Sequence, residues 1–194
     1  MKEIELKAHV YNRKEVISKL NSIATYLGIV DKKDTYYHIP VCNNDKKYIS
    51  VRIRKEKKIV NSIENEQIFL TYKRKELIQD EKNISIEVND EHECIIDSEC
   101  AINAIFEDLN ACVALNKEKH VEHWNYTKND FVFHIELCTV PPLGDFLEIE
   151  VLCENDDEKT VSIIKSTEEE LLISCNIPLE NIEKRYYSDM LNNY

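Results

Sequence analysis

Charged and aliphatic residues alternate in the first segment of the chain, Glu3-Ile4-Glu5-Leu6-Lys7. Successive side chains of a β-strand point to opposite faces, so Glu3, Glu5 and Lys7 share one face and the two aliphatic residues share the other. The aliphatic face requires an apolar layer, and the charged face requires either bulk water or a wet, charged cavity. Taken alone, the segment is also typical of an ordinary half-exposed strand.

The same alternation returns in later segments, where acidic or basic residues again occupy every second position. If the aliphatic faces pack outward against helices, the charged faces line a lumen. The residues expected there are Glu3, Glu5, Lys7, Arg52, Arg54, Lys73, Lys75, Glu87, Glu136, Glu148 and Glu150. Burying so many charges without partners is prohibitive. We therefore expect them to pair with each other, with metal ions or with a ligand of high charge density.

Mixed acidic and basic groups of this kind indicate a specific chemistry. Clustered carboxylates bind hard divalent cations such as Mg²⁺ or Mn²⁺, which prefer oxygen ligands. Clustered Arg and Lys side chains bind phosphate oxygens, and Arg often does so with two hydrogen bonds. A polyphosphate that carries its own metal ion satisfies both sets, which points to phosphoryl or nucleotidyl transfer.

The elements that position these residues follow from the hydrophobic periodicity. Strands are expected at residues 2–11, 31–39, 47–56, 66–76, 82–90, 117–127, 130–139 and 145–153. Helices are expected at about 13–27, 98–113, 157–174 and 186–192, the first with Gly28 as its C-terminal cap. The fold class is therefore α+β, an eight-stranded antiparallel β-barrel or tunnel with flanking α-helices.

Composition limits the alternatives. With 194 residues, few Gly and few Pro, the chain is expected to form a single domain over residues 1–194. The net charge of −12 disfavours non-specific nucleic-acid binding. No apolar stretch approaches the roughly 18 residues that span a membrane. Seven Cys without CxxC pairs, and no signal-peptide pattern, favour a reducing, cytoplasmic location.

An ordered set of motifs resembles the CYTH superfamily, the triphosphate tunnel metalloenzymes. These include class IV adenylyl cyclases, thiamine triphosphatases and inorganic triphosphatases. The motifs are ExExK at 3–7, Asp-Thr-Tyr-Tyr at 34–37, Val-Arg-Ile-Arg at 51–54, Thr-Tyr-Lys at 71–73, Leu-Gly-Asp-Phe-Leu-Glu-Ile-Glu at 143–150 and Tyr-Ser-Asp-Met-Leu at 187–191. The Leu-Gly-x-Phe form looks more like the cyclase branch than the thiamine triphosphatase branch.

The resemblance implies roles for the matched positions. The metal ligands it implies are Glu3, Glu5, Glu136, Glu148 and Glu150. The substrate-binding residues it implies are Lys7, Arg52, Arg54, Lys73, Lys75 and Lys119, with Lys7, Arg54 and Lys73 also catalytic. Glu87, Tyr36 and His123 are further candidates. The implied cofactor is Mg²⁺ or Mn²⁺.

One strand departs from the family pattern. The cyclase branch carries a Lys-x-Arg pair a few residues before an aromatic, and counting back from Tyr126 places Val121 and His123 there. Neither is a full cation at neutral pH, which brings full activity into question. Lys119 shares the same strand face and is expected to compensate, or Lys117 after a shift of register.

Three functions remain open at this point. The first is cyclisation of ATP to 3′,5′-cyclic AMP and pyrophosphate by an adenylate cyclase-like lyase. The second is hydrolysis of inorganic triphosphate, thiamine triphosphate or a nucleoside triphosphate. The third is non-catalytic binding of a nucleotide or polyphosphate. The partner is ATP or another triphosphate in each case, and a homodimer is expected because related proteins are often dimers.

Overall fold

The computed structural model describes residues 2–41, 47–60, 63–79, 85–153 and 157–192. For residues 2, 59, 60, 63, 73–79 and 85–91 it describes only the backbone. Two compact units can be distinguished by their internal contacts. Unit 1 contains Met1–Val30 and Lys119–Tyr194, and unit 2 contains Asp31–Glu118. That the chain acts as one domain over residues 1–194 stays a prediction.

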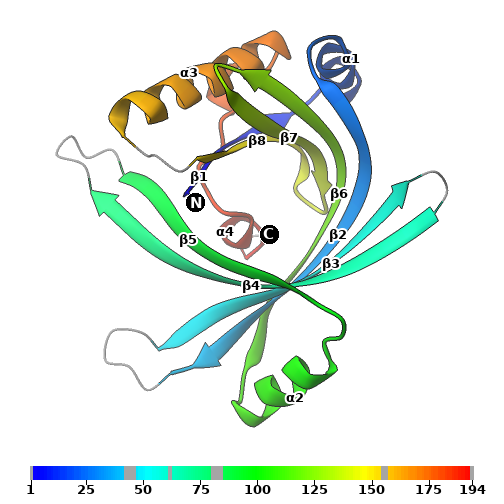
Figure 1. The fold of residues 1–194 in the computed structure, drawn as a ribbon, viewed down its shortest axis with the longest axis vertical. Helices are drawn as coiled ribbons and strands as arrows, with labels where there is room; N and C mark the ends of the chain where they lie inside the picture. Colours follow the sequence, from blue (N-terminus) through cyan, green and yellow to red (C-terminus); the bar gives the residue numbers. More distant parts are fainter. Residues whose placement is uncertain (1, 42–46, 61–62, 80–84, 154–156, 193–194) are drawn as a thin grey trace. The chain divides into compact units, whose positions relative to one another are not determined.

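Strands dominate both units (Figure 1). The elements are β1 (Lys2–Val10), α1 (Arg13–Ile23), β2 (Thr25–Pro40), β3 (Tyr48–Val60), β4 (Ile63–Gln79), β5 (Ser85–Ile96), α2 (Cys100–Asp108), β6 (Cys112–Lys128), β7 (Phe131–Val140), β8 (Gly144–Cys153), α3 (Glu158–Ser174), the 3₁₀ turn η1 (Leu179–Asn181) and α4 (Tyr187–Leu191).

The strands form one eight-stranded sheet in the order β1-β8-β7-β6-β2-β3-β4-β5. Pairing is antiparallel between β1 and β8, β8 and β7, β7 and β6, β3 and β4, and β4 and β5. This confirms the predicted eight-stranded antiparallel architecture with flanking helices. Within the described ranges, the strand order does not pair β1 with β5, so these pairings do not close the sheet into a barrel. No helix in these ranges is long and apolar enough to cross a membrane.

Several predicted boundaries were wrong. The first helix ends at Ile23, not at residue 27, because Ala24 is already extended (φ −130°, ψ 161°) and the β-prone Thr25 and Tyr26 follow it. Gly28 therefore lies inside β2, with φ of 119°, and is not a helix cap. Several strands are also longer than predicted, since their polar ends were read as loops.

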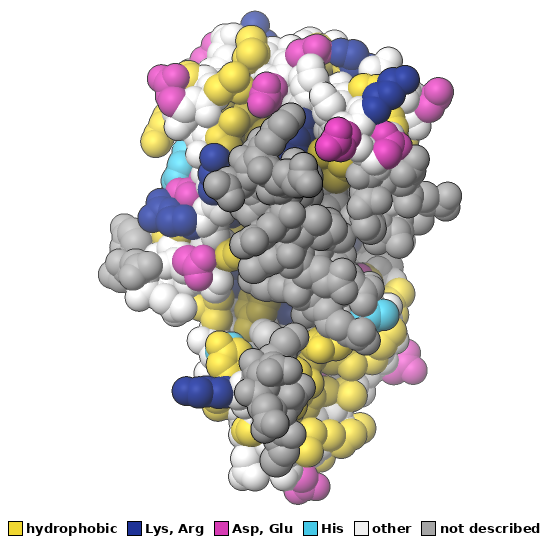
Figure 2. Space-filling model, turned by 90° about the vertical axis from the view of Figure 1, so that its left-hand side faces the viewer, with side chains coloured by type: hydrophobic (Ala, Val, Ile, Leu, Met, Phe, Trp, Pro, Cys, Tyr) yellow, Lys and Arg dark blue, Asp and Glu magenta, His cyan; other side chains and the backbone are white. Residues whose placement is uncertain are grey.

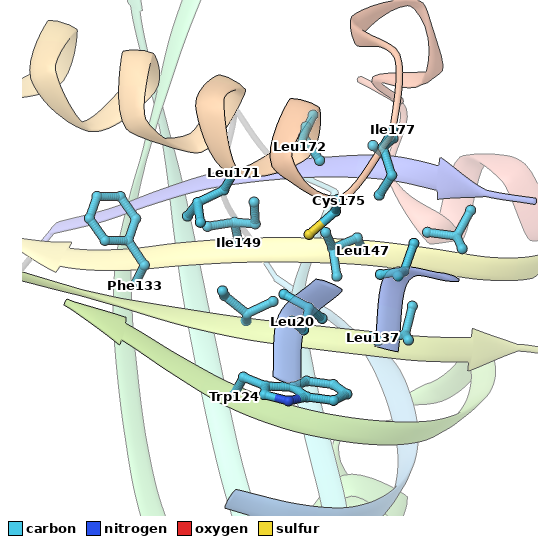
Figure 3. Packing of buried hydrophobic residues seen from close by; sticks show 14 of the residues in the cluster. Leu20, Trp124, Phe133, Leu137, Leu147, Ile149, Leu171, Leu172, Cys175 and Ile177 are labelled. Atoms are coloured by element: carbon cyan, nitrogen blue, oxygen red, sulfur yellow. The ribbon is translucent and has the colours of Figure 1, made fainter. Parts of the chain in front are cut away.

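The core of unit 1 lies between α1, α3 and the aliphatic face of β1, β8, β7 and β6 (Figure 3). Leu20 of α1, Trp124 of β6 and Leu172 of α3 are at most 1% exposed. The Trp124 indole also donates a hydrogen bond to Asn21 Oδ1 at 2.8 Å, which satisfies its one polar group. The aliphatic face is therefore sealed by helices, as the alternation predicts, and the charged residues of the same strands take the other face.

Arg13 fastens α1 to three strands of unit 1. Its Nη1 donates to Thr139 Oγ1 and Asp145 Oδ1, both at 3.1 Å, and its Nη2 donates to Glu122 Oε1 at 2.9 Å. These acceptors lie on β7, β8 and β6. A single planar guanidinium with five donors can bridge several acceptors in this way, which a lysine ammonium cannot do with the same geometry.

Unit 2 has a separate, smaller core under α2. Phe106 is 8% exposed and its ring lies 4.8 Å from the ring of Tyr37 between centroids. Ile39 of β2 and Ile53 of β3 belong to the same cluster. Since Ile53 faces this core, the alternation of β3 places Arg52 and its even-numbered neighbours on the opposite face.

A buried carboxyl group lies within α3. Glu168 is 1% exposed, and its Oε1 has no hydrogen-bond partner among the residues described. Burial raises the pKa of Glu168 to about 8; Lys165 opposes the shift, and Glu5 and Glu169 add to it. The folded chain therefore keeps this group protonated at neutral pH.

Glu168→Gln is expected to stabilise the protein at alkaline pH. The ordinary pKa is 4.5 and the folded value is about 8, so between these values the folded state holds a proton that the unfolded state has released. Stability must then fall as pH rises through this window, and the neutral amide removes that loss. We expect a gain of about 4–5 kcal/mol at pH 9 and no gain below pH 4, measured by urea denaturation.

The matched control is Glu158→Gln at an exposed position in the first turn of the same helix, which should leave the pH dependence of stability nearly unchanged. A Glu168→Gln protein whose stability shows the same pH dependence as the wild type would contradict this account of the buried carboxyl.

Candidate functional site

A row of ionisable side chains crosses four strands of unit 1. In the strand register, Lys7 of β1 lies opposite Glu148 of β8, Glu148 lies opposite Glu136 of β7, and Glu136 lies opposite His123 of β6. One step along, Glu5 lies opposite Glu150. Directly opposite residues have side chains on the same face, so these groups are neighbours, as the alternation predicted.

Lys119 neutralises the centre of this row. Its Nζ lies 2.5 Å from Glu148 Oε2 and 3.4 Å from Glu136 Oε2, and its side chain is 5% exposed. Burial alone would lower the pKa of Lys119, but the charge of Glu148, the other acidic groups nearby and the hydrogen bond to Glu148 together outweigh burial and raise that pKa well above its usual range. Burial alone would raise the pKa of Glu148, and Lys119 holds it below its usual value. The two groups are therefore an ion pair.

Carboxylates remain crowded beside this pair. Although the Glu5 residue has solvent access, its carboxyl is closely surrounded by protein atoms, and this desolvation raises its pKa to about 7. Repulsion from Glu148 and Glu3 adds to the shift, while Lys119 and Lys7 oppose it. Burial also lowers the pKa of Lys7. Desolvation and acidic neighbours both disfavour the ionised form of this carboxyl group, and a bound cation would favour that form.

The donor chemistry of this face fits a hard divalent cation, since carboxylate oxygens are the ligands that Mg²⁺ and Mn²⁺ prefer. No ready-made group of three His, Cys, Asp or Glu side chains at metal-binding distance occurs in the part of the chain that the structure describes. Lys119 accounts for this in part, because it draws Glu148 and Glu136 to itself. The assignment of Glu3, Glu5, Glu136, Glu148 and Glu150 as metal ligands stays a prediction.

Unit 2 carries a second cluster, centred on Asp34 of β2. The Asp34 side chain is fully buried and accepts two hydrogen bonds from Arg54, from Nε at 2.7 Å and from Nη2 at 3.0 Å. Lys117 Nζ lies 3.1 Å from Asp34 Oδ2. Burial alone would raise the pKa of Asp34, but Arg54 and then Lys117 hold it far below its usual value. Lys117 also donates to Tyr36 Oη at 3.2 Å and lowers the Tyr36 pKa.

Arg52 lies on the same face of β3 as Arg54. Its Nη2 donates to Thr71 Oγ1 at 3.0 Å and to Glu93 Oε2 at 3.2 Å. Thr71 in turn donates to Glu93 at 2.7 Å. The two arginines are thus held in fixed directions by hydrogen bonds to neighbouring side chains.

The structure brings most predicted site residues together within each unit. Those found on the charged face of unit 1 are Glu3, Glu5, Lys7, Lys119, His123, Glu136, Glu148 and Glu150. Those found on the charged face of unit 2 are Tyr36, Arg52 and Arg54. The side chains of Lys73, Lys75 and Glu87 lie outside the described residues.

Sequence reasoning missed Asp34, Thr71 and Tyr187 as parts of these clusters, although all three lie in motifs that were noted for the resemblance. The signal for Asp34 was its parity with Tyr36 on one strand. Which basic residue it joins could not be read from the chain, because that depends on the pairing of β2 with strands far away in sequence.

Val121, which counting from Tyr126 placed at a lost cationic position, is fully buried in an apolar cluster with Cys138 and Phe146. Lys117 and Lys119 of the same strand are buried cations. That Lys119 or Lys117 compensates for the departure from the family pattern stays a prediction.

These features identify the protein class. Residues 1–187 match the family model of the CYTH domain, and the chain therefore belongs to the CYTH family. No curated protein matches the chain.

Solved structures give the same architecture. The PH1819 protein from Pyrococcus horikoshii OT3 is 25% identical, with a TM-score of 0.71 over 98% of both chains. A protein from Vibrio parahaemolyticus, provisionally named an adenylate cyclase, is 17% identical, with a TM-score of 0.73 over 99% of this chain and 98% of its own. A protein from Hippeastrum, provisionally named an adenylyl cyclase and described as having a dominant triphosphatase activity, is 12% identical, with a TM-score of 0.63 over 100% of this chain and 96% of its own. The last two likenesses concern the fold alone.

Asp34→Asn is expected to destabilise the protein by about 3 kcal/mol at pH 7, since it leaves Arg54 and Lys117 buried without their counter-charge. The folded pKa of Asp34 is lowered, so its contribution is present above the ordinary carboxyl pKa and is lost as pH falls below about 4. Urea denaturation at pH 7 and pH 3 should show the difference between wild type and variant shrinking in acid.

Glu64→Gln provides the control, because Glu64 pairs with Lys57 on the surface and its side chain is 61% exposed. Its loss should cost less than about 0.5 kcal/mol. Equal effects of the two substitutions would contradict the central place given to Asp34.

Proposed function

We propose that this protein is a metal-dependent enzyme that acts on a triphosphate, and that its reaction is the cyclisation of ATP to 3′,5′-cyclic AMP and pyrophosphate. The observation that carries the proposal is the separation of charge into two prepared clusters. Unit 1 presents crowded carboxylates, and unit 2 presents basic side chains held in place by Asp34 and Thr71.

The cationic residues have the chemistry that phosphate oxygens require. Arg52 and Arg54 are oriented by hydrogen bonds, and Lys7 and Lys119 lie on the charged face of unit 1. In the proposal Lys7, Arg52, Arg54, Lys73, Lys75 and Lys119 bind the phosphates. Preorganised charges of this kind stabilise the negative charge that develops during phosphoryl and nucleotidyl transfer.

The proposed metal ligands are Glu3, Glu5, Glu136, Glu148 and Glu150. A bound Mg²⁺ or Mn²⁺ would supply Lewis-acid stabilisation of phosphate oxygens. Lys119 has a second part in this arrangement, because it holds the pKa of Glu148 below its usual value although burial alone would raise it. Glu148 is thus ready as a ligand at neutral pH.

In the proposed reaction the ribose 3′-oxygen attacks the α-phosphorus and loses its proton. A new bond joins that oxygen to phosphorus, the bond from phosphorus to the oxygen of the β-phosphate breaks, and pyrophosphate leaves. Lys7, Arg54 and Lys73 are proposed to stabilise the charge on the phosphoryl oxygens. The cyclase-like segment at 143–150, which forms β8 and the turn before it, favours this reaction.

Triphosphate hydrolysis is the second candidate. It is favoured by the fold likeness to the Hippeastrum protein with its described triphosphatase activity. Water would then attack a terminal phosphorus, the bond from that phosphorus to the bridging oxygen would break, and orthophosphate and the remaining diphosphate would be released, with the same cations and carboxylates engaged. The two reactions differ in which oxygen attacks and in which phosphorus it attacks.

Product analysis tests the proposal. Purified protein is incubated with ATP, and separately with inorganic triphosphate, with Mg²⁺ or Mn²⁺, and the products are resolved by chromatography. Cyclic AMP and pyrophosphate are expected from ATP. Orthophosphate without cyclic AMP would replace the cyclase by the triphosphatase, and binding without turnover would leave only a nucleotide-binding protein.

Lys7→Met is expected to lower kcat/KM for the triphosphate about 100-fold, because one cation at the phosphates is removed. The control is Lys57→Met, since Lys57 lies in a partly exposed pair with Glu64 away from both clusters. Equal kinetics for Lys7→Met and the wild type would remove Lys7 from the site.

The remaining expectations follow the family. A homodimer, a cytoplasmic location and the lack of nucleic-acid binding stay predictions. On the face shown in Figure 2, acidic and basic side chains are interspersed over the described surface and do not merge into a basic stripe.

A further inference from the structure

The C-terminal segment after α3 is docked along β1. Ile182 forms an isolated antiparallel bridge with Ala8, and the Glu183 amide donates to the Lys7 carbonyl at 2.8 Å. The Lys7 ammonium in turn donates to the Arg185 carbonyl at 2.6 Å. We call residues 182–186 the C-terminal strap. It delivers the first residue of α4 to the charged face of unit 1.

That first residue is Tyr187, which is 9% exposed. The Tyr187 hydroxyl donates a hydrogen bond to Glu148 Oε1. Cys138 Sγ lies 3.5 Å from the hydroxyl oxygen of Tyr187. Its ring meets the ring of Phe146 edge-on at 5.1 Å between centroids. The apolar part of the side chain thus packs in the small cluster beneath α4, and the hydroxyl reaches into the ion-pair row.

Two ammonium groups lie beside the ring. Lys7 Nζ is 4.2 Å from the ring centroid of Tyr187, and Lys119 Nζ is 5.2 Å from it. Both distances are within the range in which the negative face of an aromatic ring attracts a cation. Tyr187 is therefore in contact with Glu148, Lys7 and Lys119 at once.

We propose that Tyr187 is a positioning residue of the enzyme, whose hydroxyl fixes the Glu148 carboxylate and whose ring fixes the Lys7 ammonium. The inference rests on the proposed function, in which Glu148 is a metal ligand and Lys7 binds the triphosphate. Lys119 donates to Oε2 of Glu148, while Tyr187 and the Cys138 thiol, the latter at 3.7 Å, both donate to Oε1. A carboxylate oxygen can accept two hydrogen bonds, so Glu148 is oriented and can still bind through Oε2.

Packing alone does not account for a tyrosine here. Phenylalanine would fill the cavity next to Phe146 equally well and would avoid burying a hydroxyl. The hydroxyl is useful only through the groups it touches, which are Glu148 and Cys138. This separates two roles that substitutions can test independently, because Tyr187→Phe removes the hydroxyl alone and Tyr187→Leu removes the ring as well.

The test combines metal binding with kinetics. Tyr187→Phe is expected to raise the Kd of Mn²⁺, measured by calorimetry on the purified full chain, about 10–100-fold, as loss of a group that orients a ligand does. With saturating Mn²⁺, its kcat should fall while its KM for triphosphate stays near the wild-type value. Tyr187→Leu should in addition raise KM, because the Lys7 ammonium loses its contact with the aromatic ring.

Tyr126→Phe is the matched control, since Tyr126 lies in the helix-covered core of the same unit and loses only its hydroxyl. It should leave Mn²⁺ binding and both kinetic constants unchanged. Mn²⁺ affinity and kcat in Tyr187→Phe equal to those of the wild type would overturn the inference.

Crystal structures of wild type and Tyr187→Phe without metal distinguish failure of this inference from failure of the proposed function. The inference expects the Glu148 carboxylate to rotate or become disordered in the variant, whatever the protein catalyses. An unchanged Glu148 overturns it. A wild type that neither binds Mn²⁺ nor converts a triphosphate overturns the proposed function, and the Glu148 pose then still decides whether Tyr187 positions it.

Discussion

The ion pair between Lys119 and Glu148 is the interaction on which the charged face of unit 1 depends. Both groups are almost fully removed from water, and each alone would be driven toward its neutral form. Together they remain charged, and Tyr187 contacts Glu148 while Glu136 lies beside Lys119. A pair of this kind adds little net stability compared with an apolar pair, but removal of one partner is costly. The cluster therefore serves mainly to hold charged groups in fixed positions, and it adds little to the free energy of unfolding.

In unit 2 the buried cluster has the opposite arrangement of charge. There a buried carboxylate, Asp34, stands at the centre and basic groups surround it. The excess on this face is positive, while unit 1 has an excess of carboxylates around Glu5. Each unit thus neutralises most of its own buried charge and keeps a surplus of one sign. A polyanion that travels with divalent cations is complementary to both surpluses.

Much of this could be read from the sequence, because strand alternation decides faces without any knowledge of the fold. The placement of Glu3, Glu5 and Lys7 on one face of β1 follows from parity alone. The pairing of charges between strands could not be read, because it depends on which strands pair and in what register. The distance from Lys119 to Glu148 and the bidentate contact of Arg54 with Asp34 are results of that register.

The error in the first helix has the same origin. The first helix was extended too far because Leu27 continued its periodicity, while the backbone had already become extended at Ala24. The local sequence pattern does not show whether a segment becomes helix or strand when contacts with residues far away in the sequence decide between the two.

The contacts of the N-terminus also bear on the order in which the chain can fold. The hydrogen bonds of Arg13 to Glu122, Thr139 and Asp145 span 109, 126 and 132 residues. The strand that opens the chain pairs with β8, and its ions meet their partners only there. During synthesis on the ribosome, the first strand and helix therefore emerge long before anything can hold them. Closing such long loops is slow, and the acidic, charged face of β1 helps to keep this waiting segment soluble until its partners arrive.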